Sequence, residues 1–418
     1  MTEDSRLSKI GILIQQNKFT EAERILKELL SEDSNDIHLL SLLAEVNLQQ
    51  SRPDTAKSII DNAIGLSPDS PHLFFIKSRI AIQQDDYDGA ERNIEQSIAL
   101  DPYDADYFAL LANIKLSRKQ FEKALELSDT ALEIDAENLL ALNTRSTALL
   151  KLNKSEESFD TIRGALREDP NNAYTHANYG WGLLEKGDPK QALVHFKESL
   201  KNDPDFDTAQ AGMVEALKAT NPFYRLFLKY AFWMSNLTAR YQWGVIIGFY
   251  VVYRIINSLA RNNEALQPYL YPLLIVLALF AFSTWVITPI SNLFLRFNPY
   301  GQLLLDRKEK MSSNFVAASL SVSVLGVLLY FIFADNRFLP IAAFGFAMML
   351  PLSVMFSRTK QKNALIKYAI VMTGIGILAI GITFKTGNIV NGASLIFIFG
   401  FIGFQWVANY LMIKESNH

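Results

Sequence analysis

The sequence predicts an all-α protein with two parts: a solenoid of about six helical-hairpin repeats with a capping helix, and then a six-helix transmembrane domain. Helix-ending prolines and small residues recur at a fixed period in the first half, and six long apolar stretches follow in the second. The charge also changes sign, from 24 basic and 38 acidic residues in 1–220 to 16 basic and 5 acidic residues in 221–418. A chain of 418 residues is too long for one compact core, so two domains are expected.

Residues 173–206 show the repeated unit most fully. Asp188 and Pro189 form a turn signal between two helical segments. Gly180 and Ala192 are small, so the two helix backbones can approach each other closely. The unit is therefore predicted to be a helical hairpin.

The same punctuation recurs upstream at a constant spacing. Helix-ending prolines stand one or two steps of a 34-residue period apart, at Pro68, Pro102, Pro170 and Pro204, and Ala136 takes the skipped place. Twelve residues before each of these five positions lies a small residue: Ala56, Ala90, Ala124, Ser158 and Ala192. A fixed period of this length indicates a solenoid, and six units fit between residues 3 and 206.

This pattern resembles the tetratricopeptide repeat (TPR) family over residues 3–218. The family's 34-residue unit favours small residues at its eighth, twentieth and twenty-seventh positions and proline at its thirty-second. The eighth positions read Ile10, Ala44, Ser78, Ala112, Ser146 and Gly180, and the twenty-seventh read Leu29, Ala63, Ser97, Ala131, Ala165 and Ser199. The first unit departs at both positions and is expected to be a degenerate cap, and residues 208–218 are expected to form a closing helix.

The resemblance implies a concave surface for peptide or helical ligands. The family's two-carboxylate clamp for chaperone C-termini needs lysine at position five, which here reads Leu7, Ser41, Phe75, Ala109, Asn143 and Ala177. That partner is therefore excluded. The acidic balance also argues against nucleic acid, because its phosphates would be repelled.

The resemblance also nominates groove residues, since positions two, five and nine of a first helix project into the family's concave face. They are Asp106, Asn113, Asn143, Thr147, Tyr174 and Trp181. Asparagine amides can bond a partner's backbone, and Tyr and Trp offer large apolar contacts with few rotatable bonds. The alternative is that Tyr174 and Trp181 pack between repeats.

Residues 221–241 are predicted to form an amphipathic elbow at the membrane interface. Helical spacing puts Phe223, Leu226, Phe227 and Tyr230 on one face and leaves Arg225 and Lys229 elsewhere, and a helix in the headgroup region needs aromatic residues beside basic ones. The residues expected at the interface are Phe223, Arg225, Phe227, Lys229 and Tyr230. The alternative is a linker helix that docks on the last repeat.

Six apolar stretches make up the predicted transmembrane domain, 242–418. They lie at about 243–259, 270–290, 315–334, 338–356, 368–384 and 389–413. At about 1.5 Å per residue, each is long enough, or nearly so, to cross a hydrocarbon layer about 30 Å thick. Twelve Lys and Arg residues flank the spans on one side and three on the other, which places both termini in the cytoplasm of a bacterial cytoplasmic (inner) membrane protein.

The predicted spans contain few ionisable side chains that could take part in catalysis or ion transport. Asp, Glu and His are absent from all six, and the single charge, Arg254, can snorkel to the headgroups or serve a function. Packing is expected from Gly374, Gly376, Gly381, Gly400 and Gly403 and from interhelical bonds of Ser319, Ser321, Ser323 and Thr373. The loop 297–314 is either a plain connector or a contact for the repeats or a partner.

No catalytic pattern is found. Cysteine is absent, the five histidines have no companion at ligand spacing, and no phosphate-binding loop or nucleophile elbow occurs. We therefore expect no enzyme activity, no cofactor and no metal.

The sequence thus predicts a membrane-anchored TPR scaffold or adaptor, for example an assembly or secretion-complex factor. Its partner is expected to be a membrane-associated protein at the cytoplasmic face, with membrane lipid as the second partner, and a homo-oligomer is compatible with the pattern. The alternative is a transporter or channel regulated by its repeats. A third class, a lipid-processing enzyme, would have to use the mixed-charge segment 306–310.

Overall fold

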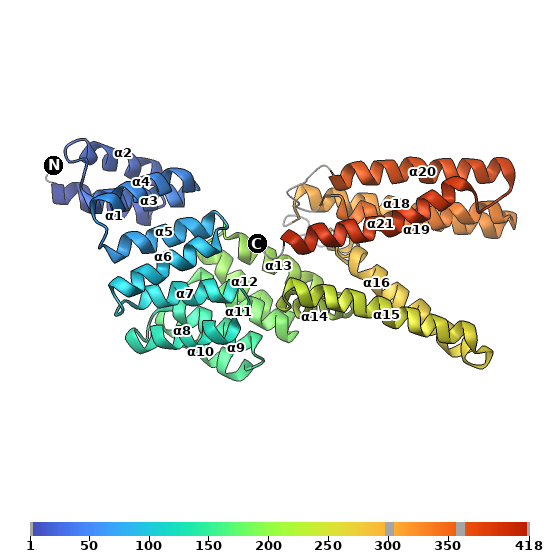
Figure 1. Cartoon of the computed structure of the whole chain (residues 1–418), viewed down its shortest axis with the longest axis horizontal. Coiled ribbons are helices and arrows are strands. Elements are labelled where there is room, and N and C mark those ends of the chain that lie inside the picture. The colour runs from blue at the N-terminus through green and yellow to red at the C-terminus, as the bar shows by residue number, and fades with distance from the viewer. Residues whose placement is uncertain (1–2, 297–304, 357–363, 416–418) are drawn as a thin grey trace. The chain divides into compact units, whose positions relative to one another are not determined.

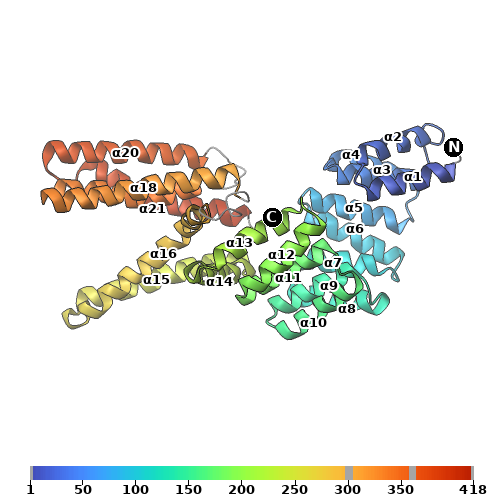
Figure 2. The same ribbon diagram turned by 180° about the vertical axis from the view of Figure 1, so that it is seen from behind.

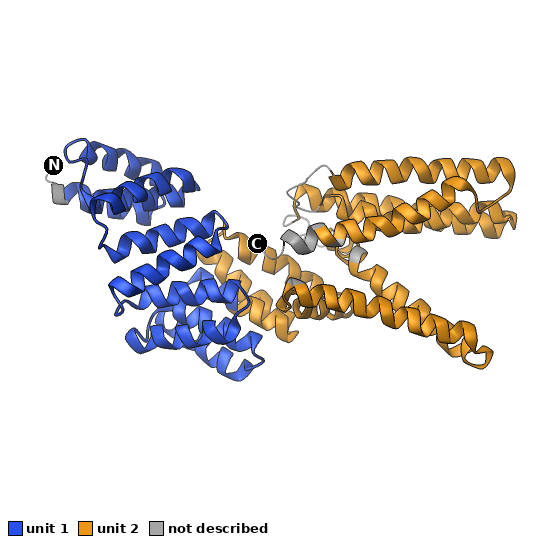
Figure 3. Ribbon diagram, viewed as in Figure 1, with its two compact units in different colours: residues 1–178 blue, residues 179–418 orange. Residues whose placement is uncertain are grey.

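The computed structural model describes residues 3–296, 305–356 and 364–415, and these residues form helices and no strands. The chain divides into two compact units, residues 1–178 and 179–418 (Figure 3). The all-α class and the solenoid of hairpins are confirmed. The membrane domain with six spans stays a prediction.

The first unit consists of antiparallel helical hairpins in sequence order (Figure 1). Its helices are α1 (Glu3–Gln15), α2 (Phe19–Leu30), α3 (Ile37–Gln49), α4 (Pro53–Leu66), α5 (Pro71–Gln83), α6 (Tyr87–Leu100), α7 (Ala105–Ser117), α8 (Phe121–Ile134), α9 (Leu139–Lys151) and α10 (Ser155–Glu168). α11 (Ala173–Lys186) begins the sixth hairpin and crosses into the second unit. Each predicted repeat is therefore one hairpin.

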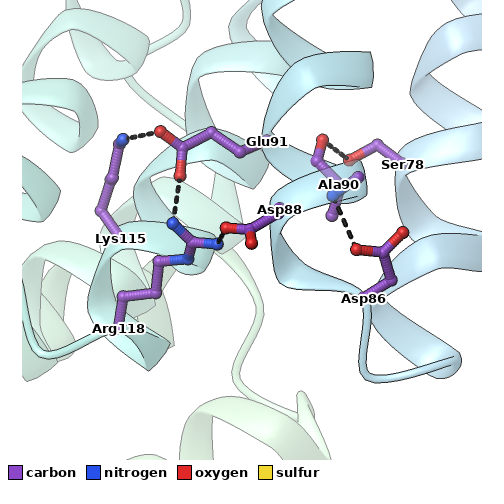
Figure 4. Close-up of polar contacts among 8 residues, drawn as sticks. Ser78, Asp86, Asp88, Ala90, Glu91, Lys115 and Arg118 are labelled. Atoms are coloured by element: carbon purple, nitrogen blue, oxygen red, sulfur yellow. Dashed lines mark hydrogen bonds and ion pairs between the residues drawn. The ribbon is translucent and has the colours of Figure 1, made fainter. Parts of the chain in front are cut away.

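Small residues meet where the two helices of a hairpin cross. Ala44 and Ala56 are both fully buried. In the third hairpin the Ser78 hydroxyl donates to the Ala90 carbonyl at 2.8 Å (Figure 4), and in the fifth the Ser146 hydroxyl donates to the Ser158 carbonyl at 3.0 Å. The eighth and twentieth positions of a repeat thus touch, and a serine there also satisfies its own buried hydroxyl.

The turn inside every hairpin contains one residue in the left-handed conformation. These residues are Asn17, Ser51, Asp85, Lys119, Asn153 and Gly187, with φ between 57° and 85°. They recur once per repeat at the same period as the prolines, so the backbone repeats six times even where the side chains differ. Only the last is glycine, which explains why the sequence alone does not reveal this position.

The second unit begins with the rest of the sixth hairpin, α11 and α12 (Pro189–Asn202), and the closing helix α13 (Asp207–Ala219). A Cβ atom at Gly180 would lie 2.7 Å from the Phe196 ring, and one at Gly212 would lie 2.2 Å from it. Phe196 is fully buried between these two glycines. Gly180 is therefore small because an aromatic ring occupies the space, as the predicted close approach requires.

Further helices follow in the second unit (Figure 2). They are α14 (Pro222–Asn236), α15 (Ala239–Asn262), α16 (Gln267–Leu295), α18 (Arg307–Phe333), α19 (Leu339–Val354), α20 (Ala364–Thr386) and α21 (Gly392–Glu415). In the described residues, five segments are long and apolar enough to cross a membrane: Arg240–Asn262, Glu264–Thr284, Arg307–Phe333, Asn336–Val354 and Ala364–Thr386. In α21 the apolar segment is the shorter Gly392–Ala408, so the sixth span stays a prediction.

The predicted loop 297–314 is partly helical, because α18 already begins at Arg307. Asp306 caps this helix by accepting from the Glu309 amide at 2.6 Å, and the Glu309 carboxylate accepts from the Asp306 amide at 2.9 Å. Residues 297–304 lie outside the described part of the chain. The mixed charges of 306–310 thus include a helix start.

α18 and α19 pack backbone to backbone. Ser319 donates to the Gly345 carbonyl at 2.7 Å and Ser323 donates to the Ala342 carbonyl at 2.9 Å, as predicted for interhelical bonds. Ser321 and Thr373 differ from the prediction, since each hydroxyl donates to a carbonyl of its own helix. A membrane helix pair is stabilised by such close contacts of small residues.

The predicted packing glycines fall into two groups. Cβ atoms at Gly376, Gly400 and Gly403 would meet Phe344, Met372 and Tyr368, respectively. Around Gly374 and Gly381, no described atom lies within 4 Å of such a Cβ. Gly374 and Gly381 are both exposed on α20, so they make no close helix contact among the described residues.

Candidate partner-binding surface

Successive first helices of the hairpins are joined by polar contacts. Arg79 on α5 donates to Glu45 on α3 at 2.9 Å, and its guanidinium lies 5.6 Å from the centroid of the Phe75 ring. The Arg79 and Glu45 side chains are both partly exposed. The face formed by α3, α5, α7 and α9 therefore offers a cation, an anion and an aromatic ring to a partner.

On α7 the predicted groove residues Asp106 and Asn113 reach solvent. Asp106 is exposed, and its carboxylate accepts from the Asn138 amide at 2.7 Å. Asn113, two helical turns further along, is partly exposed. These two side chains can contact a partner without any change in the helix packing.

Asn143 is differently placed, with 1% of its surface exposed. Its amide nitrogen donates to the Leu139 carbonyl at 2.8 Å and to the Thr175 hydroxyl at 2.9 Å, and its oxygen accepts from Asn178 at 3.0 Å. Thr147 donates to the Asn143 carbonyl at 3.0 Å. The Asn143 amide therefore joins α9 to α11, and its hydrogen bonds are used inside the solenoid.

Tyr174 and Trp181 lie on the two sides of the division between units. Tyr174 is 41% exposed. The Trp181 indole nitrogen donates to the Thr208 carbonyl at 3.2 Å, and its ring packs edge-on against Phe196 at 5.7 Å and Phe232 at 6.2 Å. Trp181 thus connects α11 to α12, α13 and α14, which is the packing role given above as the alternative.

Three residues of the first-helix face were not predicted from the sequence: Glu45, Phe75 and Arg79. Phe75 occupies position five, and Glu45 and Arg79 occupy position nine of consecutive repeats. Opposite charges at the same position of neighbouring units were the available signal. A search for such pairs exactly one repeat apart would have found this ion pair.

A second set of charges ties α6 to α7 (Figure 4). Glu91 pairs with Lys115 and, at 3.0 Å, with Arg118, which also pairs with Asp88. The hydrogen bond and charge of Arg118 lower the pKa of Asp88. These acidic residues support the repeat contacts, so part of the negative charge of the first unit is structural.

An open groove of about 610 Å³ runs along α8, with Leu125, Leu152 and Lys154 in its lining. The acidic side chains in the lining are Glu122, Glu126, Asp129 and Glu133. Of these, Asp129 pairs with Arg145 at 2.6 Å. The lining of this groove is therefore mainly acidic.

The five predicted interface residues lie along α14. Phe223 and Lys229 are exposed, and Phe227 and Tyr230 are partly buried against Tyr224 and Phe280 at 5.6 Å each. Arg225 donates to the Ala219 carbonyl at 3.1 Å and so caps α13. A Cβ at Gly187 would lie 2.9 Å from Lys229 Cε, so the lysine stem covers the turn of the sixth hairpin.

In the described parts of the chain, no three His, Asp or Glu side chains gather as a potential metal site. The expectation that the protein is not an enzyme stays a prediction.

Comparison with known protein families identifies repeats in the N-terminal part of the chain. Two overlapping stretches, residues 13–73 and 47–114, match the model of a family described as tetratricopeptide repeat. No curated protein matches the chain.

The solved structures similar to this chain include MamA, with 19% identity, covering 41% of this chain and 93% of that chain at a TM-score of 0.32. They include YrrB, described as a TPR protein with an unusual peptide-binding site. It has 17% identity and a TM-score of 0.32, and the match covers 44% of this chain and 96% of that chain. A tetratricopeptide repeat protein from Parabacteroides merdae has 14% identity and a TM-score of 0.44, and the match covers 50% of this chain and 81% of that chain. On the family match and the repeated hairpin geometry, the N-terminal part of this chain, residues 13–114, belongs to the tetratricopeptide repeat family.

Proposed function

We propose that the protein is a membrane-anchored TPR scaffold that binds a protein partner at the cytoplasmic face of a bacterial inner membrane. One observation carries the proposal: tetratricopeptide repeats and five helices long enough and apolar enough to cross a membrane occur in the same chain. Repeats of this kind stack into extended binding surfaces. The apolar helices supply an anchor for that surface.

The partner is proposed to contact the first-helix face. Five of the predicted residues have exposed or partly exposed side chains: Asp106, Asn113, Thr147, Tyr174 and Trp181. Glu45, Phe75 and Arg79 extend the same face. Hydrogen-bonding amides beside an aromatic ring and an ion pair suit a peptide or helix that carries both polar and apolar side chains. Asn143 and Trp181 enter the proposal as supports of this face, because their polar groups are used within the chain.

The distribution of charge supports the proposed topology. The repeats carry a negative net charge and the membrane half a positive one, and twelve of the basic residues flank the predicted spans on the side of the repeats. Lys and Arg are retained on the cytoplasmic side during insertion. Both termini are therefore proposed to be cytoplasmic, with six spans between residue 242 and the C-terminus.

The topology can be measured because the chain contains no cysteine. Single cysteines at Tyr103 in the repeats and at Thr386, the last residue of α20, should react oppositely with a membrane-impermeant maleimide in intact cells. Thr386→Cys should be labelled, and Tyr103→Cys should be labelled only after the membrane is opened. Labelling of both in intact cells, or protection of both, would contradict the proposed topology.

The partner surface is tested by photo-crosslinking in cells from position 113, on the first-helix face, and from position 103, at a turn. We expect one protein to be crosslinked from 113 and not from 103. The double variant Asn113→Ala, Tyr174→Ala should lose that partner, whereas Asn93→Ala, Tyr103→Ala should retain it. The assignment fails if the two double variants capture the same proteins.

A transporter or channel regulated by its repeats is the competing function. The close α18–α19 contact, in which Ser319 and Ser323 donate to backbone carbonyls, supports an anchor, because those hydroxyls are used for helix packing. Solute uptake by purified protein in liposomes would favour the transporter.

A further inference from the structure

α14 has one face that is packed against the end of the solenoid. Tyr224 and Leu228 are buried on this face. The Tyr224 hydroxyl donates to Glu215 on α13 at 2.7 Å, and the Lys218 ammonium lies 5.8 Å from the centre of the Tyr224 ring. A buried, hydrogen-bonded tyrosine of this kind fixes the rotation of α14 about its own axis.

The far end of α14 is attached to the sixth hairpin as well. The Asn236 amide donates to Glu185 on α11 at 3.1 Å, and Phe232 packs edge-on against Trp181 with ring centres 6.2 Å apart. α14 is therefore held to the closing helix α13 at its first end and to the sixth hairpin at its far end. Its opposite face must point away from that repeat.

That opposite face carries large apolar side chains. Phe223, Leu226 and Trp233 are 78%, 66% and 51% exposed, and their spacing of three and seven residues places them on one side of the helix. We call these three residues the α14 stripe. A stripe of this kind marks a surface that contacts something other than water.

The surroundings of the stripe indicate a lipid surface. Only Leu237 and Thr238 separate α14 from the apolar helix α15, and Tyr230, which helical spacing places between Phe223 and Leu226 on the same face, contacts Phe280 of α16 at 5.6 Å. Residues 221–263 contain no Asp or Glu, whereas Lys229 and Arg240 supply exposed positive charge. Large apolar side chains next to cations suit the boundary between acyl chains and anionic headgroups.

We infer that α14 lies in the cytoplasmic membrane surface, with its stripe in the acyl boundary of anionic phospholipid and its other face holding the sixth hairpin. This inference rests on the proposed membrane anchoring. Its consequence is that α11, α12 and α13 are kept at the membrane by a rigid helix rather than by a tether. A partner that contacts the last repeat is then bound next to the lipid headgroups.

Spin labels on single cysteines test the inference on the full chain, which contains no native cysteine. The purified protein is placed in vesicles of phosphatidylcholine and phosphatidylglycerol, and nitroxide collisions with oxygen and with a water-soluble nickel complex are compared. Labels at Leu226 and Trp233 should show a several-fold higher oxygen-to-nickel ratio than a label at Val194. Val194 is the matched control, because it is 54% exposed on α12 in the same unit.

A label at Leu328 on α18, which is 52% exposed, separates this inference from the proposed anchoring. If the 328 label is in lipid while those at 226 and 233 behave like 194, the α14 inference is wrong and the anchor stands. If the 328 label is in water, the membrane anchoring itself is wrong, and the inference falls with it. Lipid-like ratios at 226, 233 and 328 support both.

The choice of anionic lipid is tested with charge variants of the 226-labelled protein. Replacing phosphatidylglycerol by phosphatidylcholine should lower the oxygen-to-nickel ratio at 226. Lys229→Gln with Arg240→Gln should remove most of that difference, whereas Lys190→Gln with Lys197→Gln on α12 should leave it unchanged. An equal effect of the two pairs would overturn the assignment to anionic headgroups.

Discussion

At the scale of single residues, the hairpins depend on small side chains where the helices cross and, in the sixth hairpin, on a large side chain that fills the space beside two glycines. Alanine or serine at positions eight and twenty lets two helices touch in most hairpins. In the sixth hairpin the Phe196 ring lies between Gly180 of the same hairpin and Gly212 of the closing helix α13. The positions of the small residues could be predicted from spacing. The position of the Phe196 ring between Gly180 and Gly212 depends on the packing of α13, which spacing does not predict.

Tyr107 gives a prediction for alkaline pH. Burial raises its pKa to about 12, with further contributions from Asp104 and Asp101. Because the folded-state pKa is raised, the neutral phenol stabilises the fold fully below the unfolded pKa of about 10, and this stability is lost as pH rises through about 12. Tyr107→Phe should therefore lose less helix signal between pH 10 and pH 12 than the wild type, as measured by circular dichroism.

Tyr103→Phe is the matched control, since Tyr103 lies four residues away in the preceding turn and is exposed. Its alkaline transition should follow that of the wild type. If the Tyr103 variant changed the transition as much as the Tyr107 variant, burial of Tyr107 would not be the cause.

At the scale of helices, α18 and α19 approach each other backbone to backbone. A Cβ at Gly345 would lie 2.4 Å from the Ser323 amide nitrogen, and one at Gly326 would lie 2.4 Å from the Ala342 amide nitrogen. Neither glycine was predicted to pack, whereas Gly374 and Gly381 were. Glycine in an apolar helix permits close contact, but only the partner helix decides which glycines use it.

Gly345→Ala is expected to destabilise this helix pair by about 1–3 kcal/mol, because the added methyl group meets backbone that cannot move aside. Gly374→Ala is the control: nothing described lies within 4 Å of its Cβ position, so the melting temperature should stay equal or rise slightly. Thermal unfolding in detergent measures both. Equal melting temperatures for the two variants would show that α18 and α19 do not touch at Gly345.

At the scale of the whole molecule, the boundary between compact units lies at 178/179, whereas the predicted domain boundary lies at 220. The change in composition near residue 220 marks where apolar helices begin. Composition indicates which surroundings the side chains prefer, and not which helices pack together. Compactness depends on contacts, and α13 and α14 make contacts in both directions: Val214 packs with Leu295 and Leu305, and Asn236 bonds Glu185. Most of the last repeat therefore belongs to the same compact unit as the helices that follow it.

Hydrogen exchange should report this attachment. Asn236→Ala removes the bond to Glu185, worth about 1 kcal/mol, so amides in residues 179–186 and in α14 should exchange roughly fivefold faster. Amides of α3 to α8 should be unaffected, because they belong to the other unit. Ser235→Ala is the control, since that hydroxyl donates to the Phe232 carbonyl in its own helix.

The prediction is contradicted if Asn236→Ala and Ser235→Ala give the same exchange, or if faster exchange extends into α3 to α8. Either result would mean that α14 does not hold the sixth hairpin.

The sequence by itself determined the all-α class, the 34-residue hairpin period and the apolar helices, because these depend on local spacing and composition that a single chain displays directly. Only the tertiary structure decided the use of particular side chains. Asn143 and Trp181 were predicted to meet a partner from their helix positions, yet their polar groups bond neighbouring helices. Which contact a side chain makes depends on what the next helix brings within about 3 Å, and one-dimensional spacing carries no information about that distance.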